Sequence, residues 1–367
     1  MSREVISDKQ AISLVIIFIA GTNAIMLTAT SAKKDIWIAI IIAILLSMVM
    51  AFVFGRLHYL FPNKDWLEIS EICFGRFLGK IINIVIVLFL FESTAQILRN
   101  TTQFTVEVSY FKTPRVIVDI VIIIICIWIV KAGIEVMGRW SEFFILPFTI
   151  APLIVMILLI NRMNINNILP ILENGLSPVI HGAFEAVMFP FTQSIAFLML
   201  IPSFSEKKSA FKVFTVGFLI GGGLLLLLVL PTILILGINE SSELFYPTYA
   251  AVSRLEIADF IQRLEIIVGA LFMLGAFIKV SIFLIATCKG VSKILKFIDY
   301  RFIVTPIGLL IVNLVYFEFD NIMEYFIFGT GVWYYYVIPF QLGIPIILWI
   351  TAEIKVRSQR IDKLNQI

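Results

Sequence analysis

Ten apolar stretches, each about as long as a membrane-spanning helix, follow one another from near the first residue to near the last. They run over residues 10–31, 36–55, 79–101, 115–132, 141–160, 180–201, 210–237, 262–287, 302–317 and 332–353. A helix needs about 20 apolar residues to cross roughly 30 Å of hydrocarbon. Of the 367 residues, 60% are hydrophobic and 14% charged, whereas about 25% are charged in an ordinary soluble domain. The sequence therefore predicts an all-α membrane protein with ten transmembrane helices.

The connections between the stretches are short, so we expect a single membrane domain over residues 1–367. Its two halves would cover about 10–160 and about 180–353, followed by a cytoplasmic tail at 354–367. With the N-terminus inside, the inner segments carry 19 Lys and Arg residues and the outer segments carry 8. Cytoplasmic loops are enriched in these residues, so both termini are predicted to be cytoplasmic.

Several kinds of function are excluded by what the sequence lacks. The net charge of +3 is spread over short loops, which argues against a nucleic-acid partner. The three cysteines and two histidines match no metal-ligand spacing. Phosphate-binding, nucleophile and dinucleotide motifs are also missing. We therefore predict neither an enzyme nor a metal or cofactor site, and no catalytic residue.

The first and sixth stretches, which open the two halves, are each interrupted near the middle. The first contains Gly21-Thr22-Asn23, and the sixth contains Phe189-Pro190-Phe191. Glycine weakens a helix, and proline removes a backbone donor. Broken helices at matching positions of two halves indicate a transporter's central site, although a packing glycine and a proline kink would give the same pattern. The ligand-binding residues predicted at the breaks are Gly21, Thr22, Asn23, Met188, Phe189 and Pro190.

Other spans contribute polar side chains that a plain membrane helix would not carry. Glu92 in the third span is accompanied by Gln96, and Ser281 lies in the eighth. Glu92 is either a structural glutamate between helices or a cavity-lining group that binds an amine or takes up a proton. We predict that Glu92, Gln96 and Ser281 form further parts of the ligand site.

Lys279 is the one basic residue that belongs to neither the inner nor the outer segments, because it lies inside the eighth span. It precedes Lys289 at the inner end by ten residues, about 15 Å of helix, which is far for a lysine to reach the interface. Three interpretations remain open: a substitute for a sodium ion between the first and eighth helices, a carrier of a coupling proton, and a structural ammonium that holds the first helix. All three expect contact with carbonyls near Gly21.

His181 and Glu185 lie four residues apart in the outer half of the sixth span. This spacing puts both side chains on one helix face. We predict that they line an extracellular entrance, and a structural hydrogen bond between them is the alternative.

The order and spacing of several segments resemble the spore germination permease family, the B subunits of nutrient germinant receptors. The segments are KKDIWIAI, FPNKDWLEISEICFGRFLGK, ILPILENGLSPVIHGAFEAVMFPF and YPTYAAVSRLEIADFIQRLE. This family belongs to the amino acid–polyamine–organocation transporter superfamily. The resemblance implies a LeuT-like 5+5 inverted repeat with broken helices 1 and 6 and a small-molecule pocket between them. One departure is the first break, where G-T-N replaces a glycine-richer stretch, which suggests that Asn23 contacts the ligand directly.

The resemblance also implies the biological role. The chain would sense a germinant, commonly an amino acid, in the spore inner membrane, together with a receptor A subunit and a C-subunit lipoprotein. Two alternatives stay open. One is a proton-coupled amino-acid or amine symporter that uses Glu92 or Lys279 as the proton carrier. The other is a water or ion conduit within a larger complex.

Overall fold

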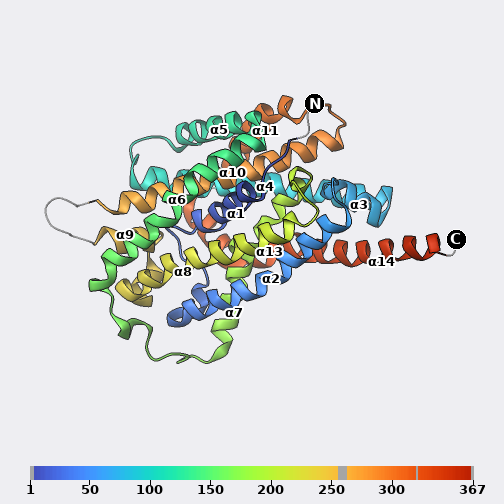
Figure 1. The fold of residues 1–367 in the computed structure, drawn as a ribbon. Helices are drawn as coiled ribbons and strands as arrows, with labels where there is room; N and C mark the ends of the chain where they lie inside the picture. The colour runs from blue at the N-terminus through green and yellow to red at the C-terminus, as the bar shows by residue number, and fades with distance from the viewer. Residues whose placement is uncertain (1–3, 255–262, 320, 365–367) are drawn as a thin grey trace.

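Long helices that run roughly along one axis dominate the computed structural model of this chain (Figure 1). The structure describes residues 4–254, 263–319 and 321–364. The first half contains α1 (Asp8–Gly21), the 3₁₀ helix η1 (Thr30–Asp35), α2 (Ile36–Leu60), α3 (Trp66–Phe74), α4 (Arg76–Val108), α5 (Arg115–Ala132), α6 (Ile134–Leu159), and the 3₁₀ turns η2 (Ile160–Arg162) and η3 (Ile165–Ile168). The second half begins with α7 (Leu176–Ala186), the π-helical turn η4 (Val187–Phe191), and the 3₁₀ helices η5 (Thr192–Met199) and η6 (Ile201–Ser203). It continues with α8 (Ser209–Glu243), α9 (Pro247–Ser253), α10 (Glu265–Ile294), η7 (Tyr300–Phe302), α11 (Val304–Phe317), α12 (Ile322–Ile327), η8 (Phe328–Val332), α13 (Trp333–Ile338), η9 (Pro339–Gly343) and α14 (Ile344–Leu364).

Seven helices in the described part of the chain are long and apolar enough to cross a membrane. They account for seven of the ten predicted spans, and α1, α5 and α11 occupy the other three. Of these, α1 and α11 are only 14 residues long, and α5 carries three charged residues. The structure thus supports an integral membrane protein, and the number ten stays a prediction.

Several predicted boundaries differ from the structure. The first span is helical only to Gly21, and residues 22–29 have no helical structure before η1 begins. The polar connection at 56–78 contains α3, which begins at a capping box of Asp65 and Glu68. α14 continues through Leu364, into the predicted tail at 354–367; residues 365–367 lie outside the described part. The same holds for residues 255–262, which include the start of the eighth predicted span.

α1, η5 and α10 form the centre of the bundle. Residues 13–25 and 278–288 are buried without interruption, as are all residues of η5. α1 packs against α6, α8 and α10, and α10 also packs against α4 and α5. The outer helices instead expose large apolar side chains, such as Leu45 on α2 and Trp128 on α5. Such a surface suits lipid, and the buried centre is therefore protected from lipid on all sides.

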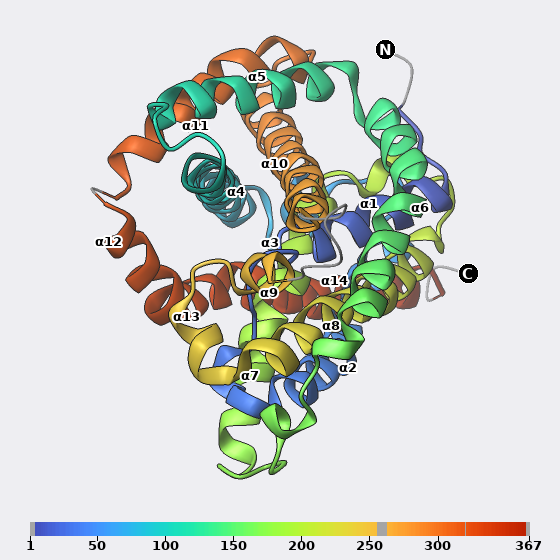
Figure 2. The ribbon, with the colours of Figure 1, turned by 90° about the vertical axis from the view of Figure 1, so that its left-hand side faces the viewer.

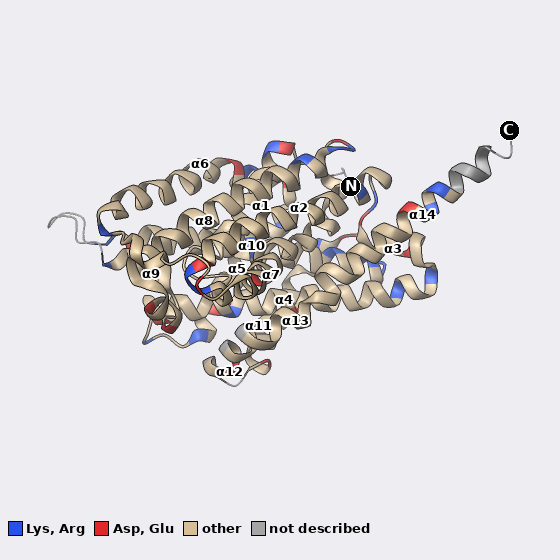
Figure 3. Cartoon of the chain, turned by 90° about the horizontal axis from the view of Figure 1, so that it is seen from below, with Lys and Arg blue, Asp and Glu red and all other residues tan. Residues whose placement is uncertain are grey.

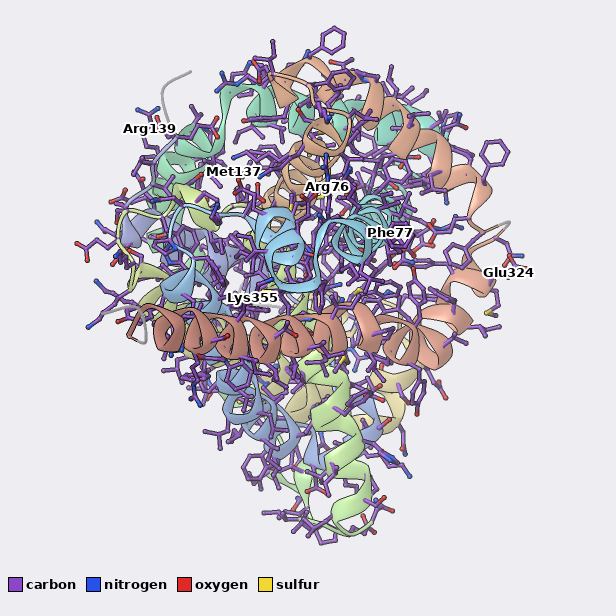
Figure 4. All side chains as sticks on the ribbon, turned by 90° about the vertical axis from the view of Figure 1, so that its right-hand side faces the viewer. Arg76, Phe77, Met137, Arg139, Glu324 and Lys355 are labelled. Carbon is purple, nitrogen blue, oxygen red and sulfur yellow. The ribbon has the colours of Figure 1, made fainter. Side chains whose placement is uncertain are left out.

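Both chain ends lie toward the right-hand end of the bundle in Figure 1. There Glu4 forms ion pairs with Lys289 of α10 and Arg301 of η7, and the Lys355 ammonium donates to the Ile72 carbonyl of α3. Figure 4 looks onto this end, with Arg76, Arg139 and Lys355 labelled. Charged residues concentrate near the two ends of the bundle and leave the long middle sections apolar (Figure 3).

Candidate functional site

The break after α1 coincides with a contact between two glycines. A Cβ atom added to Gly21 would lie 2.2 Å from the Cα of Gly275 on α10, so the two backbones touch. Beyond Gly21, the Asn23 amide donates to the Ile19 carbonyl at 2.9 Å and satisfies one of the free carbonyls at the helix end. The chain then runs without helical structure to residue 29.

The break after α7 lies at Phe189, whose φ of −135° and ψ of 111° are extended rather than helical. Pro190 follows it and has no backbone N–H. The Thr28 hydroxyl donates to the Phe189 carbonyl at 3.0 Å. The two broken segments, about 160 residues apart in the chain, are thus joined directly.

Lys279 of α10 occupies the space between the two breaks and is fully buried. Its ammonium donates to the Thr22 hydroxyl at 3.0 Å. It also lies 4.9 Å from the ring centre of Phe18 and 4.5 Å from that of Phe189, within the range of cation–π attraction. The hydrogen bond goes to a side-chain hydroxyl next to Gly21 and not to the backbone carbonyls that the sequence suggested.

A cavity of about 360 Å³ lies beside these breaks, a size typical of small-molecule sites. Its lining comes from the segment after α1, from α4, from the break after α7, from the C-terminal end of α8 and from the α12–α13 region. These elements lie near one another when the bundle is viewed from its left-hand end (Figure 2). The lining residues are Met26, Leu27, Thr30, Ser93, Gln96, Ile97, Asn100, Phe189, Gln193, Ser241, Ser242, Leu244, Phe245, Pro247, Tyr325, Phe328, Gly329, Trp333 and Tyr334.

Of the residues predicted from the sequence, Gln96 and Phe189 line this cavity. The remaining predicted residues are not part of its wall: Gly21, Thr22, Asn23, Glu92, Met188, Pro190, Ser281, Lys279, His181 and Glu185. Gly21 packs on α10, Thr22 binds Lys279, and Ser281 is fully buried on α10.

Glu92 faces a second carboxyl group that the sequence did not single out. The amide nitrogen of Gln96 is hydrogen-bonded to Glu92 and, at 2.9 Å, to Glu318 just after α11. One amide nitrogen therefore bridges the two carboxyl groups. The amide oxygen of Gln96 accepts from the Trp333 indole at 2.7 Å. Gln96 therefore separates the carboxyl pair from the cavity, with its hydrogen-bonding groups already engaged.

Glu185 binds the first broken segment. Its carboxylate accepts from the backbone N–H of Ser31 at 3.2 Å and from the Ser31 hydroxyl. A carboxylate near the start of η1 is favourably placed because backbone N–H groups are free there. His181 is exposed. Of the two residues predicted at the entrance, Glu185 therefore holds η1 against α7, and His181 lies on the surface.

One boundary of the cavity is held by a contact between the C-terminal end of α4 and the chain before α9. The Tyr246 hydroxyl donates to the Glu107 carboxylate at 2.7 Å, and its ring meets Phe104 edge-on at 5.0 Å. Burial, together with the neighbouring Glu107 carboxylate, raises the pKa of Tyr246, so the hydroxyl stays a donor. The neighbouring Pro247 is part of the cavity wall.

A family described as "Spore germination protein" matches residues 5–322. The chain belongs to this family. Its relatives include Spore germination protein KB of Bacillus subtilis (strain 168), which is 26% identical over 99% of this chain and 98% of that protein. The resemblance read from the sequence segments is thereby confirmed.

Solved structures show the fold. MhsT in complex with L-phenylalanine superposes with a TM-score of 0.68 at 11% identity, covering 96% of this chain and all of that one. Mhp1, a nucleobase-cation-symport-1 family transporter with bromovinylhydantoin bound, gives 0.63 at 9% identity, covering 89% of this chain and 75% of that one. Both are LeuT-fold transporters. This germination protein therefore has a LeuT-type transporter fold.

Proposed function

We propose that this chain is the germinant-sensing membrane subunit of a spore nutrient receptor. In this proposal a small nutrient, most simply an amino acid, binds in the cavity between the two broken helices. The observation that carries it is the cavity of about 360 Å³ at the joined breaks, in a chain of the spore germination family. The related fold of MhsT holds L-phenylalanine, which supports an amino acid as the ligand.

The proposal includes the arrangement in the membrane. Ten spans form two inverted halves of five, and the bundle lies in the spore inner membrane. The end that carries both termini faces the cytoplasm. The count of Lys and Arg supports this orientation. Partner subunits of the A and C type would receive the signal, in keeping with relatives that are themselves germination proteins.

Phe189 offers a route from ligand to signal. Phe189 belongs to the cavity wall, and the ammonium of Lys279, which binds Thr22 at the end of α1, lies 4.5 Å from the centre of its ring. A ligand that moves this ring would change the contacts that fix α1 against α10. For the ligand to shift the receptor, it must bind one of the two helix arrangements more tightly than the other.

A proton-coupled symporter is the second candidate, and the carboxyl pair of Glu92 and Glu318 favours it. Gln96 binds both carboxyl groups, and two carboxylates that share a site repel each other when both are ionised, so the pair favours an exchangeable proton on one of them beside the cavity. Lys279 is the other candidate carrier in the membrane interior.

We expect spores that lack this gene to lose the response to one nutrient or nutrient mixture and to keep the response to others. The wild-type gene should restore it, and vesicles that contain this chain alone should take up no labelled nutrient. Release of dipicolinic acid measures the first result, and filter-retained radioactivity the second. An unchanged response of the deletion strain to every nutrient tested would contradict the receptor role. Proton-dependent uptake by the chain alone, lost in Glu92→Gln, would favour the symporter.

A further inference from the structure

At the end of the bundle that carries both termini, α4 has a face that no described helix of the chain covers. Its exposed side chains are Arg76, Phe77, Lys80, Ile81, Ile84 and Val85. The opposite side of α4 packs on α3, where the Asn83 amide donates to the Leu67 carbonyl at 3.1 Å. Figure 4 shows Arg76 and Phe77 at the tip of α4. This face is therefore open to the membrane.

The exposed face consists of a charged end and an apolar remainder. Arg76 and Lys80 are four residues apart, and Ile84 follows after four more, so the three side chains lie in one row on the helix surface. Phe77 and Ile81 form the adjacent row with the same spacing. Ile84 lies about 6 Å farther along the helix axis than Lys80. The face thus changes from positive charge at the end of α4 to apolar surface toward its middle.

Arg76 and Lys80 lack the internal counter-charge that other basic residues at this end have. Lys289 and Arg301 both pair with Glu4, at 3.1 and 3.0 Å, whereas Arg76 and Lys80 form no ion pair with any residue that the structure describes. Two like charges four residues apart on a helix repel each other. An anion from outside the chain would remove this repulsion, so the pair favours a negatively charged ligand.

The apolar side chains beside the basic pair define the rest of the ligand. A small anion such as free phosphate would contact the two charges and leave Phe77, which is 78% exposed, and Ile81 uncovered. A phospholipid fits both parts, since its phosphate reaches the basic pair while its acyl chains cover the apolar side chains. The guanidinium of Arg76 has the planar fork that binds two phosphate oxygens at once, and the flexible stem of Lys80 can extend along the helix. Basic residues at a membrane surface attract anionic lipids.

We propose that this face of α4 binds an anionic phospholipid, with the phosphate on Arg76 and Lys80 and an acyl chain along Phe77, Ile81 and Ile84. The lipid belongs to the leaflet on the side of both termini, which is the cytoplasmic leaflet in the orientation proposed above. Farther along, α4 forms part of the cavity wall, so the lipid would hold a helix that also contributes to the germinant cavity.

The test is native mass spectrometry of the purified full-length chain with phosphatidylglycerol and phosphatidylcholine that carry the same acyl chains. We expect the wild-type chain to bind phosphatidylglycerol at least about tenfold more tightly, because its headgroup has a net negative charge that choline would cancel. In the double variant Arg76→Gln/Lys80→Gln, phosphatidylglycerol should bind as weakly as phosphatidylcholine. Arg76→Lys/Lys80→Arg, which keeps both charges in place, should retain most of the preference.

Two controls accompany the titration. Lys207→Gln/Lys208→Gln removes two exposed charges from the loop before α8, so it changes the net charge of the chain by the same amount and should bind phosphatidylglycerol like the wild type. An excess of inorganic phosphate should not displace phosphatidylglycerol, because phosphate alone makes no contact with the apolar side chains.

Four results would overturn the proposal. Unchanged affinity for phosphatidylglycerol in Arg76→Gln/Lys80→Gln would exclude this face as the site, and an equal loss in Lys207→Gln/Lys208→Gln would mean that net charge alone sets the preference. Displacement by inorganic phosphate would indicate a general anion site. Equal binding of the two lipids to the wild-type chain would leave the face to a membrane helix of a partner subunit. None of these results concerns the nutrient response, so the lipid site and the proposed function can fail separately.

Discussion

Gly21→Ala should destabilise the protein by about 3 kcal/mol or more, the upper part of the usual range for overpacking a core. The added Cβ would lie 2.2 Å from the Cα of Gly275, and Gly275→Ala would meet Gly21 at 2.1 Å. In both variants the obstacle is backbone, so no side chain can rotate out of the way, and α1 must separate from α10. Denaturant titration in detergent measures the free energy of unfolding, and subunit abundance in spore membranes should fall with it.

Gly223→Ala is the matched control. Gly223 lies inside α8, and a Cβ added there would meet nothing within 4 Å. Alanine is the better helix former by up to about 1 kcal/mol, so this variant should be neutral or slightly more stable. Equal stabilities for Gly21→Ala, Gly275→Ala and Gly223→Ala would show that α1 and α10 are not in backbone contact.

Thr22→Val should cost about 2 kcal/mol in the wild-type protein, because it removes the hydrogen bond of a fully buried ammonium. In the Lys279→Met background the same substitution should cost less than about 0.5 kcal/mol, since no charge then remains to be satisfied. The difference between the two costs, about 1.5 kcal/mol, is the coupling energy of Lys279 and Thr22. A coupling energy of this size shows that the two residues interact.

The same titration of the four proteins measures this cycle. Additive losses would mean that Lys279 and Thr22 act independently, and the lysine would then not fix the end of α1. Lys279→Met alone should also lower the nutrient response of spores, since Phe189 would lose the cation that lies against its ring.

Both helix interruptions were predictable from the sequence because their causes are local. A glycine followed by Thr22 and Asn23 weakens a helix wherever it lies, and Pro190 removes a backbone donor in any context. The structure ends α1 at Gly21 and places the second break at Phe189. Apolar length likewise identified the long spanning helices without knowledge of their packing.

The partners across the breaks were not predictable, because they lie far away in the chain. Gly275 is one of several small residues in an apolar run, and nothing local marks it as the contact of Gly21. Glu318 follows a span boundary, so it looks like a residue of an outer loop, yet it accepts from the same Gln96 amide that binds Glu92.

The cavity wall shows the same limit. The sequence directed attention to charged residues inside spans, and the structure places Glu92 and Lys279 behind the wall, where Gln96 and Phe189 cover them. Gln193 was a visible signal, since it is a neutral amide two residues after Phe191 in an otherwise apolar segment. A neutral polar residue next to a helix break therefore indicates a possible cavity wall as well as a charged residue does, because buried polar groups need hydrogen-bond partners.

The most direct test of the central claim is the nutrient response of spores that carry Ser93→Phe. Ser93 is 5% exposed on α4 and lines the cavity, so the larger side chain should fill the space that the ligand needs. Leu88→Phe, on the same helix but 60% exposed toward lipid, controls for the substitution itself. At equal subunit abundance, we expect Ser93→Phe to abolish the dipicolinic acid release triggered by the nutrient and Leu88→Phe to leave it unchanged. A normal response in Ser93→Phe spores would contradict binding of the germinant in this cavity.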